Sequence, residues 1–382
     1  MFSFEIIHQS KRSKARVGRI QTPHGIIETP AFVPVATNAS IKAVDSTVIN
    51  QLGVQLLFCN TYHLLLHPGP EVVAQAGGLH RFMRRDGPII TDSGGFQVFS
   101  LAYNALAYRG GEDGAASGGE LKRREVKQQS GSVIKISEEG VLFRSYRDGT
   151  PILLTPESSV QIQKALGADI IIPLDALPPY HIDQRALKRS DDRTHRWEKR
   201  SLEEHRRELR DQAMYAVIHG GVDTALRRAS CEYLCREPFD GFAIGGSLGK
   251  TRQDMMSVLQ AVGPCLPDDK PRHLLGIGDL TSLEVCIPHG IDSFDSAYPT
   301  KCARHGILLT EHGPINVTRS QCKSRHEPIS AAPICREYTA AYLHHLFKAH
   351  EPVAHTIATI HNLYMMEQIM ARYRELISND AV

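Results

Sequence analysis

Short apolar segments recur along the chain, each bounded by turn residues, and stretches with helical periodicity lie between many of them. The apolar segments predict strands at Ala31–Pro34, Leu56–Thr61, Ile89–Asp92, Asp169–Leu174, Met214–Ile218, Gly241–Ile244, His273–Ile277 and Ser293–Ser296. The periodic stretches predict helices at Val48–Leu52, Ser158–Leu166, Ala225–Arg236, Arg252–Val262 and Leu280–Val285. Because strands alternate with helices, the pattern favours parallel β/α units. The consecutive apolar residues of Ile170–Ile172 are typical of a strand that is buried on both faces.

Polar residues and glycines lie at or just past the C-terminal ends of these apolar segments. They are Asn60, Asp92, Asp175, His219, Gly245, Gly246, Gly276, Gly278 and Asp295. In a barrel of parallel strands these ends meet on one face, where active sites are built. An open doubly wound sheet also binds ligands at strand ends, but only near its switch point. Since nearly every predicted strand contributes, we predict an α/β fold of the (β/α)8 TIM-barrel class, with residues 1–382 forming a single catalytic domain.

Three segments interrupt the alternation. Gly110–Glu120 is too rich in glycine to pack, and is either a flexible insertion or a lid over the active face. Arg185–Asp211 predicts a long charged helix that contains the only tryptophan, Trp197, and its charge suits a solvated outer face better than an RNA-facing surface. Lys301–Ala349 breaks the rhythm between the last strand and a terminal helix at Val353–Ile377. We therefore predict a small inserted subdomain at residues 301–349.

The bulk composition changes this picture little. The net charge is +2, so a nucleic-acid partner is allowed but not required. The eight cysteines form no C-x-x-C pair, which fits reduced thiols in a cytosolic enzyme. The N-terminus lacks a signal-peptide pattern, and no apolar run approaches the roughly 20 residues needed to cross a bilayer. We expect a soluble, cytoplasmic protein with no membrane association.

Three carboxylates carry the candidate chemistry. Asp92 lies in the segment Thr91–Gln97, before glycines that allow close backbone approach and an aromatic residue that can stack on a flat base. The alternative is that this aspartate caps the next helix. Asp295 lies deep in a strand-like run, where a carboxylate is costly unless it has a chemical role or backbone partners. Asp175 ends another apolar strand.

Carboxylates that converge on one mouth can differ in protonation, because crowding pushes their pKa values apart. Such a pair serves displacement at an anomeric carbon, where one group attacks and the other moves a proton. The residues therefore predict carboxylate chemistry on a glycosidic bond.

Longer motifs resemble those of the tRNA-guanine transglycosylases over almost the whole chain. The matching stretches are Asn60–Leu64, Thr91–Val98, Ser158–Asp169, Gly245–Gly246, Phe294–Thr300, Tyr342–Phe347 and Thr359–Leu363. The resemblance implies a pentosyltransferase that replaces guanine at the wobble position of a tRNA anticodon with a 7-deazaguanine base. Physically this is base flipping, in which an extruded base is read by its edge and its π-face.

The resemblance also implies roles for individual residues. Asp295 would attack C1′ of the nucleotide and hold the tRNA covalently, and Asp92 would take a proton from the incoming base. Asp175 would bond the Watson–Crick edge of the base, and Phe96 would stack on it. The other base-contacting residues would be Ser93, Gly94, Gly95, His219, Gly245, Gly246 and Gly249. The residues contacting the single-stranded anticodon loop would be Gly276, Gly278, Asp279, Thr300, Lys301 and Arg304.

Departures from the family pattern concern the choice of base. Many members have glutamine at the position of His219, whose imidazole can still donate a hydrogen bond, with a charge that depends on pH. Bacterial members usually have valine and glutamate at the positions of Gly249 and Thr251, so the change opens room and removes a negative charge. This favours queuine, which carries a bulky cyclopentenediol, over the small cationic 7-aminomethyl-7-deazaguanine. The bulk of Leu177, where cysteine is usual, works against it.

The largest departure concerns a metal. The family binds zinc through Cys-x-Cys-x-x-Cys and a later histidine, which together form a tetrahedral structural set. When the sequence is aligned on Cys335 and His361, the first two ligand positions are Ser330 and Ala332. We therefore predict no zinc and no other cofactor. Family members pair as homodimers through this region, so a homodimer is an expectation here.

Two other functions compete with base exchange. One is a non-catalytic RNA-binding paralogue, whose mark would be loss of the catalytic acids, but Asp92 and Asp295 are both present. The other is a small-molecule glycosidase or nucleosidase on the same barrel. Salt dependence separates the two substrate classes, because phosphate contacts make tRNA affinity fall steeply with ionic strength.

Overall fold

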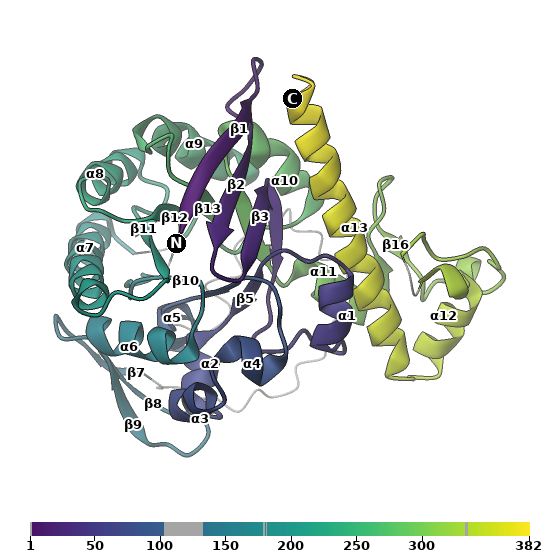
Figure 1. Cartoon of the computed structure of the whole chain (residues 1–382), viewed down its shortest axis with the longest axis horizontal. Coiled ribbons are helices and arrows are strands. Elements are labelled where there is room, and N and C mark those ends of the chain that lie inside the picture. The colour runs from purple at the N-terminus through teal and green to yellow at the C-terminus, as the bar shows by residue number, and fades with distance from the viewer. Residues whose placement is uncertain (1, 103–132, 179, 181, 333–334) are drawn as a thin grey trace.

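A ring of parallel strands forms the centre of the protein. The computed structural model describes residues 2–102, 133–178, 180, 182–332 and 335–382. The ring consists of β4 (Ala31–Pro34), β5 (Leu57–Cys59), β6 (Ile89–Thr91), β10 (Ile170–Ile171), β11 (Ala213–Ile218), β12 (Gly241–Ile244), β13 (Arg272–Leu274) and β14 (Ser293–Ser296). Neighbours in the ring pair in parallel in chain order, and β14 pairs with β4. A parallel bridge between Val35 and Phe58 joins β4 to β5, so the predicted (β/α)8 barrel is confirmed (Figure 1).

The strands are buried on both faces, and some are shorter than their apolar runs. All six residues of β11 are buried, as the near-continuous apolar pattern indicated. The predicted strand Asp169–Leu174 contains only Ile170–Ile171 as paired strand. The reason is that Gln163 bonds the next main-chain unit: its Nε2 donates to the oxygen of Ile172 at 2.8 Å, and its Oε1 accepts the N–H at 3.0 Å. A glutamine side chain thus takes the place of a neighbouring strand.

Helices surround the ring, and each predicted helix coincides with one of them apart from a few boundary residues. They are α1 (Ser46–Gln51), α2 (Thr61–Leu66), α3 (Pro70–Gln75), α4 (Leu79–Met83), α5 (Gly95–Ala102), α6 (Pro156–Leu166), α7 (Gln184–Arg207), α8 (Thr224–Leu234), α9 (Arg252–Val262), α10 (Leu280–Cys286) and α13 (Val353–Ser378). Local signals set their ends. Helix α6, for example, begins after Thr155, which accepts the N–H of Ser158, and ends at Gly167 in the left-handed conformation.

An antiparallel sheet that the pattern of apolar segments did not predict covers the N-terminal end of the barrel. Its strands are β1 (Ser3–Gln9), β2 (Arg16–Thr22) and β3 (Gly25–Thr29). Ile20 and Ile27 pack into one buried cluster with the residues that fill the barrel interior. The sheet therefore closes the end of the barrel opposite to the predicted active face.

A second unanticipated sheet lies against helix α7. Its strands are β7 (Val133–Ile136), β8 (Val141–Arg144) and β9 (Pro151–Leu154). Trp197 is fully buried in the same apolar cluster as this sheet, and its indole N–H donates to the oxygen of Glu138 at 2.9 Å. Helix α7 also buries Asp191 and Glu198, so a solvated outer face explains only part of its charge.

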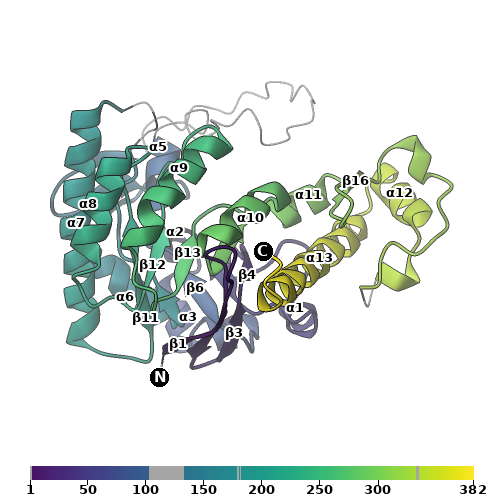
Figure 2. The same cartoon turned by 90° about the horizontal axis from the view of Figure 1, so that it is seen from above.

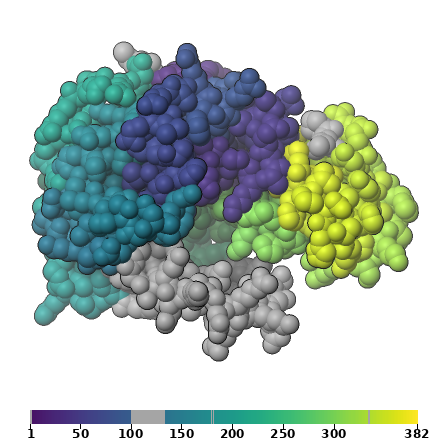
Figure 3. Space-filling model, turned by 90° about the horizontal axis from the view of Figure 1, so that it is seen from below, coloured from purple at the N-terminus to yellow at the C-terminus, as the bar shows by residue number. Residues whose placement is uncertain are grey.

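The segment after the last strand forms a lobe on one side of the barrel (Figures 2 and 3). It contains β15 (Ile307–Leu308), β16 (Ile315–Asn316), short 3-10 turns at Ser320–Cys322 and Cys335–Glu337, and α12 (Ala340–Lys348). The predicted start of the subdomain at Lys301 falls inside a helix, α11 (Tyr298–Arg304), that packs against α13. The glycine-rich Gly110–Glu120 lies outside the described residues. Among the described residues, no helix combines the length and apolar character needed to span a bilayer.

Candidate active site

A cavity of about 390 Å³, here called the central cavity, opens at the C-terminal ends of the barrel strands. It is lined by Val35, Thr37, Phe58, Asn60, His63, Asp92, Ser93, Phe96, Gln97, Ile172, Asp175, Leu177, Gly246, Leu275, Gly276 and Asp295. The three predicted carboxylates therefore do converge on one cavity. Asp92, Asp175 and Asp295 are only 8%, 6% and 7% exposed, so each carboxyl group is largely shielded from bulk water.

Asp295 lies near the C-terminal end of β14, and one of its two carboxylate oxygens is held in place. Oδ1 lies 3.1 Å from His273 Nε2 and accepts the N–H of Gly276 at 2.9 Å. The other ring nitrogen of His273 lies 2.8 Å from Ser293 Oγ, which fixes the orientation of the imidazole. Among the described residues no hydrogen-bond partner reaches Oδ2. The carboxylate is thus oriented with one oxygen available to a ligand.

Asp92 follows β6 and has only neutral hydrogen-bond donors. Oδ1 accepts the N–H of Thr61 at 2.7 Å, and Oδ2 accepts from Asn60 Nδ2 and Gln97 Nε2, both at 2.7 Å. Burial raises the pKa of Asp92 to about 6, although these hydrogen bonds act in the opposite direction. The side chain can therefore hold or release a proton close to neutral pH.

Asp175 follows β10 and is approached by two side chains. Its Oδ1 accepts from Ser93 Oγ at 3.2 Å. Its Oδ2 lies 3.0 Å from His219 Nε2, which is ion-pair distance, but the two atoms are not aligned for a hydrogen bond. Phe96 on α5 is 49% exposed and lines the same cavity. An acceptor for a base edge and an aromatic face are therefore present together.

Four of the predicted base-contacting glycines lie around the central cavity, and of these four Gly246 alone lines it. Gly94 has φ +83°, and a Cβ there would lie 3.2 Å from the nitrogen of Tyr62. Gly95 and Gly245 are close-packed, since a Cβ would lie 2.9 Å from the oxygen of Asp175 and 2.5 Å from Val217 Cγ1, respectively. These four glycines let strands and turns approach one another around the cavity.

Gly249 lies outside the lining of the central cavity. It has φ +100°, and a Cβ there would lie 2.2 Å from Cβ of Asp254. The Asp254 carboxylate accepts the N–H groups of Lys250 and Thr251, and the Thr251 hydroxyl accepts the N–H of Asp254 to cap α9. The turn itself therefore requires glycine at position 249, and the expected gain of room for the base is not seen there.

The predicted tRNA-contacting residues have mixed surroundings. Gly276 lines the central cavity and donates its N–H to Asp295. Gly278 packs closely against Ser296. Asp279 caps α10 by accepting the N–H of Ser282. Thr300 is buried, whereas Lys301 is exposed on α11 and Arg304 is half-buried.

Residues with no predicted role complete the site. His273 orients Asp295, and Gln97 bonds Asp92. Gln97 belongs to the conspicuous Thr91–Gln97 segment, so its position was a usable signal. His273 is the middle residue of β13, and the pairing of β13 with the neighbouring β14 brings it to Asp295.

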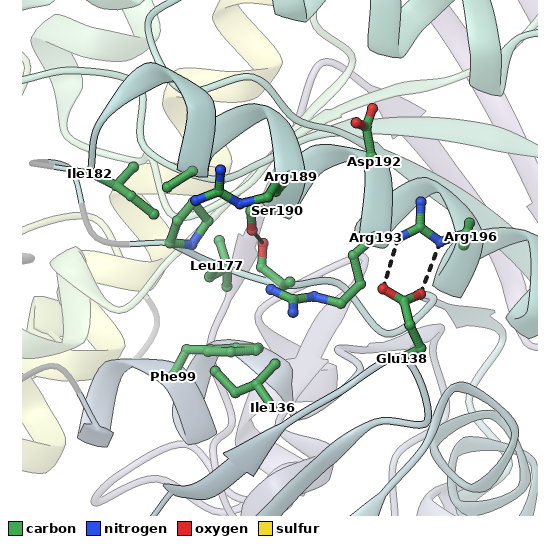
Figure 4. A pocket seen from close by; sticks show the side chains of 13 residues that line it. Phe99, Ile136, Glu138, Leu177, Ile182, Arg189, Ser190, Asp192, Arg193 and Arg196 are labelled. Carbon is green, nitrogen blue, oxygen red and sulfur yellow. Dashed lines mark hydrogen bonds and ion pairs between the residues drawn. The ribbon is translucent and has the colours of Figure 1, made fainter.

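A second cavity, of about 420 Å³ and lined by arginines, adjoins the central cavity at Leu177. Figure 4 shows the residues that line it. Arg189, Arg193 and Arg196 of α7 line it. Arg196 forms a bidentate ion pair with Glu138, at 2.9 and 2.7 Å. The bulk of Leu177 thus separates two cavities.

The residues at the family's zinc position do not fit a four-ligand zinc site. Ala332 offers no ligand atom and is fully buried. Cys335 Sγ lies 3.6 Å from the oxygen of Ile357, and His361 Nε2 lies 2.9 Å from the oxygen of Leu309. Among the described residues, the potential ligands that gather in a group of three are His24, His80 and Asp169, at the opposite end of the barrel.

Comparison with known proteins identifies the family. The family model described as Queuine tRNA-ribosyltransferase matches residues 10–116 and 120–382. The queuine tRNA-ribosyltransferase of Protochlamydia amoebophila (strain UWE25) is 58% identical over 384 residues, which cover 100% of this chain and 96% of the relative. Those of Chlamydia pneumoniae and Chlamydia felis (strain Fe/C-56) are 53% and 52% identical over 383 residues, 99% of each chain. Since the family model and the relatives span nearly the whole chain, the chain belongs to the queuine tRNA-ribosyltransferase family.

Proposed function

We propose that this protein exchanges guanine at the wobble position of tRNA for a 7-deazaguanine base, through a covalent bond between the ribose and Asp295. The observation that carries the proposal is the pair Asp295 and Asp92 in one buried cavity, each in a different hydrogen-bonding environment. Membership of the family supports the same reaction.

The first half of the reaction breaks the bond to guanine. Asp295 Oδ2 attacks C1′ of the ribose, and the bond between C1′ and N9 of guanine breaks as the new bond forms. His273 and Gly276 hold Oδ1, so the attacking oxygen is aimed without a loss of side-chain freedom at the moment of reaction. Guanine leaves with the electron pair of the broken bond, and Asp92 in its acid form supplies the proton to N9.

The second half installs the new base. The carboxylate of Asp92 takes the N9 proton of the incoming base, whose nitrogen then attacks C1′ and releases Asp295. A pKa of about 6 suits this double use, because both forms of Asp92 are accessible near neutral pH. Across the two steps Asp92 gives one proton and regains one, so the cycle balances.

Recognition of the base would come from groups around Asp175. Its carboxylate accepts N–H donors of the Watson–Crick edge, His219 lies beside it, and Phe96 stacks on the ring. The absence of a glutamate at Thr251 supports queuine as the preferred base over 7-aminomethyl-7-deazaguanine, since a cationic substituent finds no carboxylate at that position. Incorporation of the aminomethyl base alone would exclude this preference.

Three further expectations belong to the proposal. The lobe folds without zinc, which chelator-washed protein tests by elemental analysis; stoichiometric zinc would contradict it. The protein forms a homodimer, which light scattering on a sizing column tests. It acts in the cytoplasm, where its tRNA substrate is found, and fractionation of cells would check that location.

The covalent intermediate provides the sharpest test. Wild-type protein is incubated with tRNA carrying guanine at position 34, and the mixture is separated on a denaturing gel. We expect a slower-migrating protein–RNA band that disappears when excess guanine is added, and no band with Asp295→Ala. If Asp295→Ala incorporated labelled guanine into tRNA as fast as wild type does, the assignment of Asp295 as the nucleophile would be wrong.

A further inference from the structure

A third cavity, here called the side cavity, adjoins the central cavity. Its volume is about 370 Å³. It is lined by Pro178, Tyr180, Ile182, Gln184, Leu187, Asp191, His219, Gly221, Val222, Asp223, Gly246 and Ser247. Gly246 lines both cavities, so the two meet at a residue without a side chain. A ligand bound in the central cavity can therefore extend past Gly246 into the side cavity.

His219 forms part of the wall between the two cavities. Its Nε2 lies 3.0 Å from Asp175 Oδ2 in the central cavity. Its Nδ1 faces Gly246, because a Cβ at that glycine would lie 3.1 Å from this nitrogen. The imidazole thus presents one nitrogen to the base-binding carboxylate and the other to the junction of the cavities.

Asp191 is the unusual residue of the side cavity. Its side chain comes from α7, only 3% of the residue is exposed, and neither carboxylate oxygen has a hydrogen-bond partner among the described residues. The nearby cation is Arg227, but its guanidinium is committed to main-chain oxygens, including that of Gly245 at 2.8 Å. A buried carboxylate without donors is costly, so its retention calls for a partner that arrives with a ligand.

We propose that the side cavity binds the substituent that an incoming base carries at position 7, and that Asp191 accepts hydrogen bonds from a vicinal diol on that substituent. The inference rests on the proposed base exchange. Two hydroxyl donors match the two unpartnered oxygens of one carboxylate, as a bidentate pair of charge-assisted hydrogen bonds. The apolar carbons of a ring that carries such a diol suit the apolar part of the lining, which includes Leu187 and Val222.

The side cavity also has an aromatic wall. Tyr180 lines it, and Lys250 Nζ lies 5.1 Å from the centre of the Tyr180 ring. Guanine carries no substituent at this position and would leave the side cavity empty. The side cavity therefore distinguishes bases by the group attached to them, whereas the central cavity reads the purine-like ring that all of them share.

The test compares three bases on the same variants. Rates of incorporation into guanine-34 tRNA are measured for guanine, for 7-aminomethyl-7-deazaguanine and for queuine, with wild type and Asp191→Asn. We expect Asp191→Asn to lower kcat/KM for queuine by about 10- to 100-fold, the usual effect of losing hydrogen bonds to a charged group. The values for guanine and for the aminomethyl base, neither of which has a diol, should stay within about twofold of wild type.

A matched control and a second variant complete the experiment. Asp192→Asn changes the next residue of α7, a half-buried aspartate that bonds Lys188 and lines the arginine-lined cavity (Figure 4). This substitution should affect none of the bases. Leu187→Trp narrows the side cavity without altering Asp191, and should also reduce queuine use selectively.

The outcomes separate the two proposals. Equal losses for all three bases, or no loss for queuine, would overturn the assignment of Asp191. A loss shared by queuine and the aminomethyl base would show that Asp191 binds an ammonium group, and would overturn the diol. Failure of wild type to incorporate any base would instead overturn the base-exchange function, and the inference with it.

Discussion

Strand β14 carries a buried aspartate at each end, and the two have different surroundings. Asp292, just before the strand, is fully buried and bonds Arg16 of the N-terminal sheet at 2.9 and 2.6 Å. Asp295, near the other end, is held by a histidine and one main-chain N–H, and faces the central cavity. Only three positions separate the two aspartates in the sequence. The end of the barrel at which each one lies therefore decides whether it has a structural or a chemical role, and the local sequence does not.

The strand β10 repeats the comparison. Asp169, just before it, bonds His24 at 2.7 Å and His80 at 3.1 Å, and also accepts the N–H of Ile89. Asp175, beyond its other end, has one hydroxyl donor and a misaligned imidazole. At the N-terminal end of the barrel, carboxylates are satisfied by cations and imidazoles. At the C-terminal end, Asp175 and Asp295 have fewer partners and can still accept hydrogen bonds from a ligand. Such incompletely bonded carboxylates lower the stability of the fold and are typical of functional sites.

The largest expected effect is on Asp295. Asp295→Asn keeps the shape of the side chain but removes the nucleophile, so base exchange should fall by on the order of 10⁴-fold. Incorporation of labelled guanine into tRNA measures it. Thermal unfolding should be nearly unchanged, since the carboxylate forms no ion pair with Lys or Arg among the described residues. A large loss of stability would place Asp295 with the structural acids instead.

The next effect concerns Asp92. Asp92→Asn should slow both half-reactions by about 10²- to 10³-fold, because it can neither give nor take the proton. In wild type the first half-reaction needs the acid form, so adduct formation should fall as pH rises above 6. The second half needs the carboxylate, so release by the incoming base should fall as pH drops below 6. Single-turnover rates of each step, measured from pH 5 to 8, check the opposite slopes; parallel slopes would contradict the assignment.

Asp292 should affect stability and not chemistry. Asp292→Asn leaves the buried Arg16 guanidinium without its anion, which should cost about 3–5 kcal/mol in the free energy of unfolding. Denaturant unfolding measures the loss. Base exchange per folded molecule should stay close to wild type, because the residue lies at the barrel end remote from the cavity. A catalytic defect in protein that remains folded would break the comparison of the two ends.

The smallest effect is a pair of opposite pH dependences of stability. Burial tends to raise the pKa of Asp169, but hydrogen bonds from His80 and His24 outweigh it and the pKa is lowered, so its contribution is present above about pH 4 and is lost as pH falls further. The pKa of Asp92 is raised, so its ionisation destabilises the fold increasingly between about pH 4 and 6.

Unfolding of Asp169→Asn and Asp92→Asn beside wild type at several pH values tests this pair. Relative to wild type, Asp169→Asn should become less stable as pH rises from 3 to 6. Asp92→Asn should become more stable over the same range, by on the order of 2 kcal/mol. If the stability difference from wild type changed with pH in the same direction for both variants, the two ends of the barrel would not differ in their effect on a buried carboxylate.

The sequence by itself determined the barrel and the three acids of its active face. Apolar segments with polar residues at their ends predict parallel strands, because each strand is buried on both faces and only its C-terminal end meets the ligand. That reasoning needs only local pattern, so it located Asp92, Asp175 and Asp295 correctly in one cavity. It also identified the long helix α7 and the terminal helix α13.

Tertiary structure decided what each polar residue does, because partners come from distant parts of the chain. His273 became a positioning residue through pairing of β13 with β14, and Asp292 became structural through Arg16, which is 276 positions away. Gly249 lies in a tight turn against Asp254, outside the lining of the central cavity. The side cavity arises where helix α7 meets the loops after β11 and β12, a contact that no periodicity in the sequence encodes. The same contact buries Asp191, whose carboxylate has no hydrogen-bond partner within the described part of the chain.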